Sequence, residues 1–176
     1  MKNGAILLGA GLAFAAISGA ANAAGSGIGA MAANASPANS RIVKSVVEKD
    51  LEALVLAEGD TIDAKHPFDS PSVRGKTEDG LLYVLIGTAC DANGVPGCQG
   101  IMMQVRYDED DKVTWERLGK ANLNEAALSA WWDQEDDTVG FTRYVVLDDG
   151  VTWMNIRQNL RVLLSIQEND RAYVFD

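Results

Sequence analysis

The sequence predicts an α+β fold, in which helices pack on one face of an antiparallel sheet. Three observations support this prediction. Segments with helical apolar spacing open and close the folded part, strand-like segments lie between them, and short turns separate neighbouring strands. The predicted order is α-β-β-β-α-β-β-α, because antiparallel strands joined by short turns need helices to cover one of their faces.

The first predicted helix covers residues 41–57, with Ser40 as its N-cap. Its apolar residues recur at helical spacing: Ile42, Val43, Val46, Val47, Leu51, Leu54 and Val55. Two short strands are predicted at residues 61–65 and 73–77, on either side of a turn-rich segment. Residues 81–89 are apolar on both faces, which indicates a central strand.

Further strands are predicted in the second half of the chain. Residues 101–107 alternate between apolar and polar side chains, as in a strand with one covered face. Residues 112–117 are interpreted as another strand. Residues 141–147 and 151–157 flank Asp148-Asp149-Gly150, and this arrangement is typical of a β-hairpin because Asp-Gly accepts the positive φ values of a tight turn.

Two more helices complete the prediction. Asn122 and Glu125 resemble a capping box, and they predict a helix that ends near Gln134. This helix would carry three large apolar residues on one side: Leu128, Trp131 and Trp132. Residues 159–175 have leucines at helical spacing and are expected to form the closing helix.

The N-terminus resembles an export signal. Lys2 precedes an apolar run over residues 5–17, and Ala21-Asn22-Ala23 places small residues where a signal peptidase requires them. An uncleaved membrane anchor is the alternative, but this run has about 13 residues and a bilayer span needs about 20 strongly apolar ones. We therefore expect cleavage after Ala23 and a periplasmic or secreted product.

The predicted organisation has three parts. Residues 1–23 form the signal peptide, and residues 24–39 form a leader that is rich in Ala, Gly, Ser and Asn and is expected to be flexible. Residues 40–176 have a suitable length for a single α+β domain.

The charge of the chain excludes some classes of partner. The whole chain has a formal net charge of −10, and removal of Lys2 with the signal leaves −11. Nucleic acids and anionic membranes repel such a protein. A protein partner or solubility alone fits this charge, and a homodimer stays open as an alternative.

Cys90 and Cys98 are the two cysteines of the chain. An even cysteine count in an oxidising compartment predicts a disulfide, and the turn-rich residues 91–97 between them would let two neighbouring strand ends meet. A redox pair would have the spacing Cys-x-x-Cys, and a zinc site would need more ligands. We therefore predict a structural disulfide.

No catalytic constellation is found in the sequence. The single histidine, His66, lies in a turn before a proline and is interpreted as a surface residue. Residues 108–111 and 135–137 concentrate carboxylates, but the calcium-loop template requires a glycine where Val113 and Thr138 stand. No metal or other cofactor is therefore predicted. A pair of carboxylates could still serve a small hydrolase, although the sequence does not nominate the pair.

The four tryptophans are expected to belong mainly to the core. Trp131 and Trp132 are adjacent, however, so they cannot both face in the same direction on a helix. One of the two should be partly exposed, which makes Trp131 and Trp132 the candidates for a partner-binding surface.

Several of these segments together resemble the YbjN family, which is described as a family of bacterial sensory transduction regulators. The residues that carry the resemblance are residues 81–90 ending in Cys90, residues 98–107 opening with Cys98, Ala130-Trp131-Trp132, and Phe141-Thr142-Arg143-Tyr144 before Asp148-Asp149-Gly150. The family's Asn-x-Trp-Asn core is replaced, with Ser129 and Trp132 near the positions of the asparagines. The resemblance covers about residues 43–165. It implies a fold like that of type III secretion chaperones and no known catalytic residues.

The leading hypothesis is an exported, non-enzymatic protein that binds or stabilises a protein partner, with a regulatory role in the cell envelope. Two alternatives stay open at this point. One is an acidic, inhibitor-like module whose acidic turns dock on a basic enzyme, and the other is a small carboxylate-based hydrolase.

Overall fold

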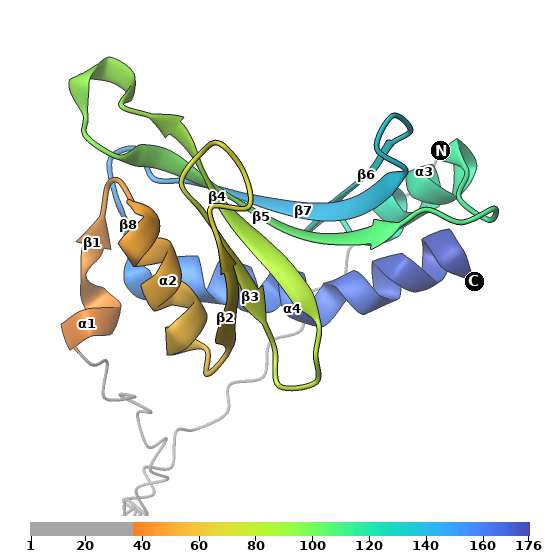
Figure 1. Ribbon diagram of the computed structural model, residues 1–176, viewed down its shortest axis with the longest axis horizontal. Coiled ribbons are helices and arrows are strands. Elements are labelled where there is room, and N and C mark those ends of the chain that lie inside the picture. Colours follow the sequence, from red (N-terminus) through yellow and green to blue (C-terminus); the bar gives the residue numbers. More distant parts are fainter. Residues whose placement is uncertain (1–36) are drawn as a thin grey trace, which may run out of the picture. The chain divides into compact units, whose positions relative to one another are not determined.

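The computed structural model describes residues 37–176, and the statements below refer to this part of the chain (Figure 1). The predicted signal peptide and residues 24–36 of the predicted leader lie outside the described residues. Residues 37–39, which were expected to belong to the flexible leader, are part of a short helix. Within residues 37–176, no helix is long and apolar enough to cross a membrane.

The described part contains four α-helices and one short 3₁₀-helix. They are α1 (Pro37–Ser40), α2 (Glu48–Ala57), η1 (Ala92–Gly94), α3 (Trp115–Asn124) and α4 (Trp153–Phe175).

The strands form a six-stranded and a two-stranded sheet, and every strand pair is antiparallel. The larger sheet has the order β2-β3-β4-β5-β7-β6 and the smaller one the order β1-β8. The strands are β1 (Ile42–Val43), β2 (Thr61–Lys65), β3 (Ser72–Lys76), β4 (Leu82–Cys90), β5 (Cys98–Asp108), β6 (Ser129–Asp133), β7 (Thr138–Val146) and β8 (Val151–Thr152).

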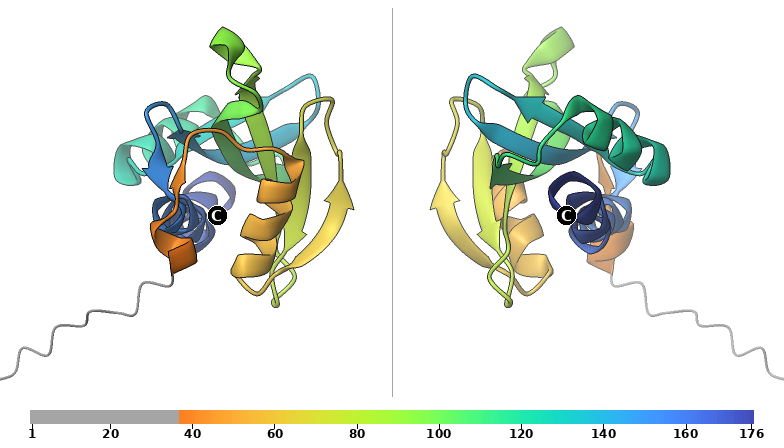
Figure 2. Two further views of the ribbon diagram at one scale, coloured as in Figure 1. Left: turned by 90° about the vertical axis from the view of Figure 1, so that its left-hand side faces the viewer. Right: turned by 90° about the vertical axis from the view of Figure 1, so that its right-hand side faces the viewer.

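Helices α2 and α4 cover one face of the larger sheet. Helix α4 packs against β5 and β7, helix α2 packs against β2 and β3, and helix α3 contacts α4 and β6. Figure 2 shows the sheet curving over α2 and α4, with α4 seen along its axis. The predicted fold class, an antiparallel sheet with helices on one face, is confirmed. The chain has four strands between α2 and α3, where the predicted order α-β-β-β-α-β-β-α has three.

The hydrophobic core lies between the sheet and these helices. Alternate residues of the central strands point into it, because successive side chains of a strand face opposite sides of the sheet. The fully buried examples include Leu85, Ile101, Met103 and Phe141 on the strands and Leu160 on α4. Burial of each such side chain stabilises the fold by roughly 1.5–3 kcal/mol. The apolar face of the sheet is therefore held against the helices, and the opposite face lies outside the core.

The predicted helix at residues 41–57 is wrong in its first part. Ile42 and Val43 form β1 and pair with β8, and Val46 forms a bridge with Cys98. The helix begins only at Glu48. Residues 42, 43, 46 and 47 are β-branched and favour extended structure, and the strand pairing buries Val43 and Val46.

The predicted helix that ends near Gln134 and the predicted strand at residues 112–117 are also wrong. Helix α3 begins at Trp115, and the side chain of Thr114 accepts a hydrogen bond from the backbone nitrogen of Arg117 at 3.2 Å. Thr114 is therefore the N-cap. The segment with Trp131 and Trp132 is strand β6.

The predicted hairpin over residues 141–157 is replaced by a different connection. The turn at Asp148-Asp149-Gly150 exists, and Asp149 and Gly150 have φ values of 60° and 99°. Strand β7, however, pairs with β5 and β6, whereas β8 has two residues and pairs with β1. Thr152 then caps α4, since its side chain accepts a hydrogen bond from Asn155 at 3.1 Å.

Candidate functional site

Cys90 and Cys98 are joined by a disulfide in the structure, as predicted. The two residues are directly opposite in the β4–β5 register, and the S–S distance is 2.14 Å. Cys98 is fully buried. A Cβ at Gly87 would lie 2.5 Å from the sulfur of Cys98, so the glycine leaves the space that this sulfur occupies. The disulfide therefore closes the β4–β5 hairpin, which projects from the body of the protein in Figure 1.

Trp131 and Trp132 point to opposite faces of the sheet, because they are neighbours on a strand. Trp132 faces the helix side, where its indole N–H donates to a carboxylate oxygen of Glu109 and its ring contacts that of Trp115 at a centroid distance of 5.0 Å. Trp131 faces the other side. Neither residue is fully buried.

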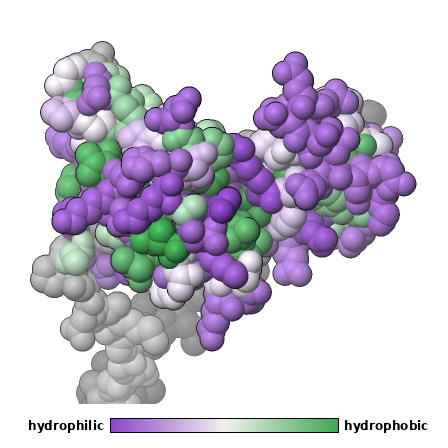
Figure 3. Space-filling model, viewed as in Figure 1, coloured by the Kyte–Doolittle hydropathy of each residue, from purple (hydrophilic) through white to green (hydrophobic). Residues whose placement is uncertain are grey.

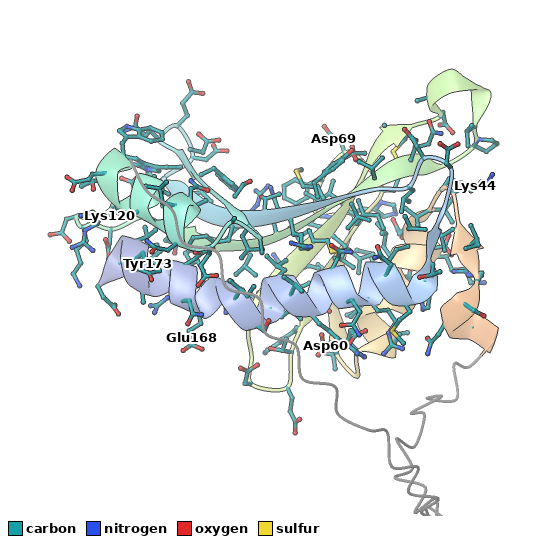
Figure 4. All side chains as sticks on the ribbon, turned by 180° about the vertical axis from the view of Figure 1, so that it is seen from behind. Lys44, Asp60, Asp69, Lys120, Glu168 and Tyr173 are labelled. Carbon is teal, nitrogen blue, oxygen red and sulfur yellow. A yellow bond between two sulfur atoms is a disulfide. The ribbon has the colours of Figure 1, made fainter. Side chains whose placement is uncertain are left out.

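The face of the larger sheet opposite α2 and α4 is called the open sheet face. The register brings together side chains from four strands on this face: Val84, Ile86, Thr88, Gly100, Met102, Gln104, Arg106, Ser129, Trp131, Gly140, Thr142, Tyr144 and Val146. The β2–β3 loop reaches this side as well. In Figure 4, Asp69 of this loop and Glu168 of α4 lie on opposite sides of the sheet.

Two aromatic rings lie flat on the open sheet face. A Cβ at Gly140 would lie 2.1 Å from the indole of Trp131, and a Cβ at Gly100 would lie 2.1 Å from the hydroxyl of Tyr144. Each ring therefore occupies space that a glycine on the neighbouring strand leaves free. The hydroxyl of Tyr144 is 2.7 Å from that of Thr88, so this ring is also held at its polar end.

A chain of hydrogen bonds fixes the polar side chains of this face. The indole N–H of Trp131 donates to Thr142 Oγ1 at 2.7 Å, and Gln104 Nε2 donates to the same oxygen at 2.9 Å. Arg106 donates to Gln104 Oε1 from Nε at 3.0 Å and from Nη2 at 2.7 Å. Gln104 is buried, so each end of its amide has a defined partner.

The guanidinium of Arg106 lies between two aromatic rings. Its central carbon is 4.6 Å from the ring centroid of Phe68 and 5.4 Å from that of Trp131, both within the range of cation–π contacts. The surrounding rings and sheet remove part of its water, which lowers the pKa of Arg106, while Asp136 and Asp133 raise it to a smaller extent. This group is therefore held in place before any ligand arrives.

Two hollows flank Arg106 on this face. One has a volume of about 280 Å³ and is mainly apolar; it is lined by Pro67, Phe68, Arg74, Leu82, Tyr83, Val84, Gln104 and Arg106. The other has a volume of about 530 Å³ and is wider and more polar; it is lined by Phe68, Met102, Gln104, Arg106, Ser129, Trp131, Asp133, Asp136, Thr138 and Thr142. Phe68, Gln104 and Arg106 line both hollows. The sequence had pointed to Trp131 but not to these three residues.

The two predicted acidic turns lie side by side at one end of the sheet. Asp108 is opposite Thr138 in the register, and the backbone nitrogen of Glu109 donates to the carbonyl of Asp137 at 2.8 Å. Figure 3 shows a mainly hydrophilic surface over the end that carries β6 and α3. Among the described residues, no three His, Cys, Asp or Glu side chains are grouped so that they could hold a metal ion.

Two carboxylates of the described part, Asp133 and Asp136, line the more polar hollow. Asp170 is buried on α4, where burial, assisted by Glu125, raises its pKa to about 6. Asp170 lines neither hollow of the open sheet face. His66 is exposed, with Nε2 at 2.7 Å from a carboxylate oxygen of Glu48. It is the surface residue that the sequence predicted.

The fold and this site define a small α+β protein with one sheet face covered by helices and one open face with a prearranged aromatic and polar surface. Residues 46–174 match the YbjN family, whose description reads "Putative bacterial sensory transduction regulator". The chain belongs to the YbjN family, as its sequence segments had suggested. The family is non-enzymatic, which confirms the expectation that the chain is not an enzyme.

Two solved structures are similar to the described fold. The crystal structure of the ExsC–ExsE complex matches with 12% sequence identity and a TM-score of 0.51, over 73% of this chain and 96% of that chain. The structure of the HopA1–SchA chaperone–effector complex matches with 10% identity and a TM-score of 0.49, over 69% of this chain and 90% of that chain. The expected likeness to type III secretion chaperones is confirmed for the fold. No curated protein matches this sequence significantly.

Proposed function

We propose that the chain is an exported, non-enzymatic protein that binds an extended segment of a protein partner on its open sheet face and acts in regulation at the cell envelope. The observation that carries this proposal is the fixed surface around Trp131: a flat indole, hydrogen-bonded to Thr142, beside two hollows. Exposed aromatic side chains that are already held in place lose little conformational entropy on binding, and such residues dominate many interfaces.

Membership of a family of sensory transduction regulators supports a regulatory role. The likeness of the fold to a chain of the ExsC–ExsE complex supports a role in protein binding. Export rests on the N-terminal sequence: Lys2, the apolar run and Ala21-Asn22-Ala23. The disulfide between Cys90 and Cys98 suits an oxidising compartment.

The binding proposal is tested with tagged wild-type protein, Trp131→Ala and a matched control, Leu123→Ala. Leu123 is an apolar side chain with 84% exposure at the end of α3, away from the open sheet face. We expect wild type and Leu123→Ala to recover the same stoichiometric partner from an envelope extract, and Trp131→Ala to lose it. Equal recovery by all three proteins, or no stoichiometric partner, contradicts the proposal.

The export proposal has a separate test. Cell fractionation and N-terminal sequencing of the full-length product should place it outside the cytoplasm, with Ala24 as its first residue. A cytoplasmic product that keeps Lys2 would contradict export and would leave the binding proposal standing.

A second candidate function rests on the contact between the two acidic turns. The hydrogen bond from Glu109 to Asp137 joins residues 108–111 and 135–137 into one acidic surface, which would suit docking on a basic enzyme. Binding at this surface should weaken strongly between low and high salt, because exposed charges are screened. Binding through Trp131 should instead be lost in Trp131→Ala, which leaves the acidic surface intact.

A further inference from the structure

Arg106 has one edge occupied and one edge available. Its Nε and Nη2 atoms both donate to Gln104 Oε1, at 3.0 and 2.7 Å. A guanidinium carries five N–H donors in a planar fork. The edge formed by Nη1 and the second proton of Nη2 has no protein acceptor in the part of the chain that the structure describes, and the side chain is exposed.

The charge of Arg106 is not neutralised by a neighbour. No carboxylate oxygen among residues 37–176 forms an ion pair with it, whereas Arg74 on the same sheet face is 2.5 Å from Asp63. Residues 1–36 contain no Asp or Glu. The nearest acids, Asp133 and Asp136, act on Arg106 only at a distance. The position of the guanidinium is thus set by Gln104, Phe68 and Trp131, and its charge remains available to a ligand.

We infer that the available edge of Arg106 binds the carboxylate of an acidic residue in an extended polypeptide segment of the protein partner. This inference rests on the proposed binding at the open sheet face and names the chemistry of the partner. Arginine and carboxylate form two parallel hydrogen bonds, which fix the direction of the ligand as well as its affinity. Contacts with Phe68 and Trp131 hold the guanidinium in place, so little entropy is lost when it binds a carboxylate.

The two hollows predict what surrounds this acidic residue. The hollow on the β4 side is lined by apolar groups such as Phe68, Leu82 and Val84, and it suits an apolar side chain. The hollow on the β6 side includes Asp133 and Asp136, and it suits a basic side chain. A ligand with an apolar, an acidic and a basic group in this order matches the surface from β4 to β6.

The spacing of these groups follows from the sheet. Strands β4 and β6 are separated by three steps in the order β4-β5-β7-β6, and each step is about 4.8 Å, which makes roughly 14 Å in total. An extended chain advances about 3.3 Å per residue, so this distance needs about four residue steps. The predicted motif is therefore an apolar, an acidic and a basic residue, in this order, within about five consecutive residues.

A nucleic acid or another polyanion does not fit this surface. The formal net charge of −10 and the carboxylates of Asp133 and Asp136 beside Arg106 oppose any ligand with several negative charges. In a ligand with one carboxylate followed by a cation, the carboxylate pairs with Arg106 and the cation with the carboxylates of Asp133 and Asp136. The chemistry thus favours a polypeptide segment of mixed charge.

The experiment is a selection from a random peptide library displayed on phage, against wild type, Arg106→Gln and Arg171→Gln. Arg171→Gln is the matched control, because Arg171 is also an exposed arginine over two aromatic rings, Tyr107 and Phe175, but lines neither hollow. We expect peptides selected on wild type and on Arg171→Gln to contain an apolar, an acidic and a basic residue in this order within about five positions. On Arg106→Gln, the acidic position should no longer be enriched.

The best selected peptide is then synthesised with Glu and with Gln at the acidic position, and both forms are titrated into wild type. The form with Gln should bind about tenfold more weakly, the low end of what a charge-assisted hydrogen bond contributes. This comparison needs no protein variant, so a folding defect in Arg106→Gln does not affect it. On Arg106→Gln, the two peptides should differ less than twofold.

The outcomes separate this inference from the proposed function. Two results would overturn the role of Arg106 and keep the open sheet face as the binding site. In the first, the selected peptides shift the indole N–H resonance of Trp131 but show no enrichment of acidic residues. In the second, the preference for Glu over Gln persists in Arg106→Gln. Selected peptides that leave the Trp131 resonance unchanged, or no enriched peptide at all, would overturn both.

Discussion

The ring of Trp131 lies over Gly140 on the neighbouring strand, so closely that a Cβ at residue 140 would be 2.1 Å from the indole. The two residues are direct partners in the β6–β7 register. Gly140 therefore determines the position of the indole. Because the indole N–H of Trp131 donates to Thr142, Gly140 also affects the chain of hydrogen bonds that leads to Arg106.

Replacement of Gly140 by alanine should displace the indole. We expect Gly140→Ala to lose about 1–3 kcal/mol of unfolding free energy, as is usual when a methyl group is forced into an occupied space. The indole N–H resonance of Trp131 should also move, because its bond to Thr142 is broken. Urea unfolding and NMR measure the two effects.

Gly119 supplies the matched control for that substitution. It lies in α3, and a Cβ added there would meet nothing within 4 Å. Gly119→Ala should gain about 0.5–1 kcal/mol, since alanine favours a helix over glycine by roughly that amount. If Gly140→Ala behaved like Gly119→Ala, the close approach of Trp131 would be refuted.

Loss of the disulfide should destabilise the β4–β5 hairpin. Closing the short loop between Cys90 and Cys98 is worth about 2–3 kcal/mol in a chain-entropy estimate. Chemical unfolding with and without reductant should show a difference of that size. Mass spectrometry of the purified exported protein should show two hydrogens fewer without reductant than with it, and free thiols would count against both the disulfide and the predicted compartment.

The buried carboxyl of Asp170 should make stability depend on pH. Burial and, to a smaller extent, Glu125 raise its pKa from 3.8 to about 6, and its Oδ1 has no hydrogen-bond partner among the described residues. The folded state therefore binds this proton more tightly than the unfolded state does. Below about pH 4 the carboxyl of Asp170 does not reduce the free energy of unfolding. The reduction grows as the pH rises to about 6 and is constant above that pH.

Asp170→Asn should remove this cost. At pH 7.5 the variant should be more stable than wild type by about 3 kcal/mol at most, and at pH 4 the two should be nearly equal. Glu168→Gln, at an exposed position of the same helix, serves as the control and should leave the pH profile unchanged. A constant difference between Asp170→Asn and wild type from pH 4 to 7.5 would contradict the raised pKa.

Glu58 joins α2 to α4 through two ion pairs. Its carboxylate oxygens are 2.6 Å from Nε of Arg157 and 2.6 Å from Nε of Arg161, and the side chain of Glu58 has only 9% exposure. Glu58→Gln should cost about 3–5 kcal/mol, because it leaves the buried charge of Arg157 uncompensated. Glu116→Gln breaks the exposed pair with Lys120 and should give no measurable change in thermal unfolding.

The strands and the helix whose sequences show a clear local periodicity were predicted well. The alternation of residues 101–107 lies within β5, and residues 61–65 coincide with β2. Residues 159–175 lie within α4. In these segments the local periodicity and the tertiary environment favour the same structure.

The predictions failed where tertiary contacts override local preference. Asn122 looked like a helix cap, but its side chain lies in the last turns of α3 and bonds both backbone groups of Ala130 on the outer edge of β6, at 2.9 and 3.0 Å. The turn at residues 148–150 was recognised, whereas the strand that follows it pairs with β1, far away in the sequence. A turn signature specifies a reversal of the chain but not the partner of the next strand.

The candidate site was predicted only in part. Trp131 and Trp132 were both predicted as candidates for a partner-binding surface, and the structure places Trp131 on the open sheet face and Trp132 on the helix side. The alternation of β5 could have placed Gln104 and Arg106 on the face opposite Val105. Phe68 comes from the β2–β3 loop, and no pattern within the sequence connects it to Arg106.

The central claim is that the open sheet face binds the partner through Trp131, and isothermal titration calorimetry of the purified partner into wild type, Trp131→Ala and Leu123→Ala tests it most directly. Trp131→Ala should weaken binding at least about tenfold, as expected for a tryptophan at the centre of an interface. Leu123→Ala should match wild type. Unchanged affinity in a folded Trp131→Ala would contradict the account.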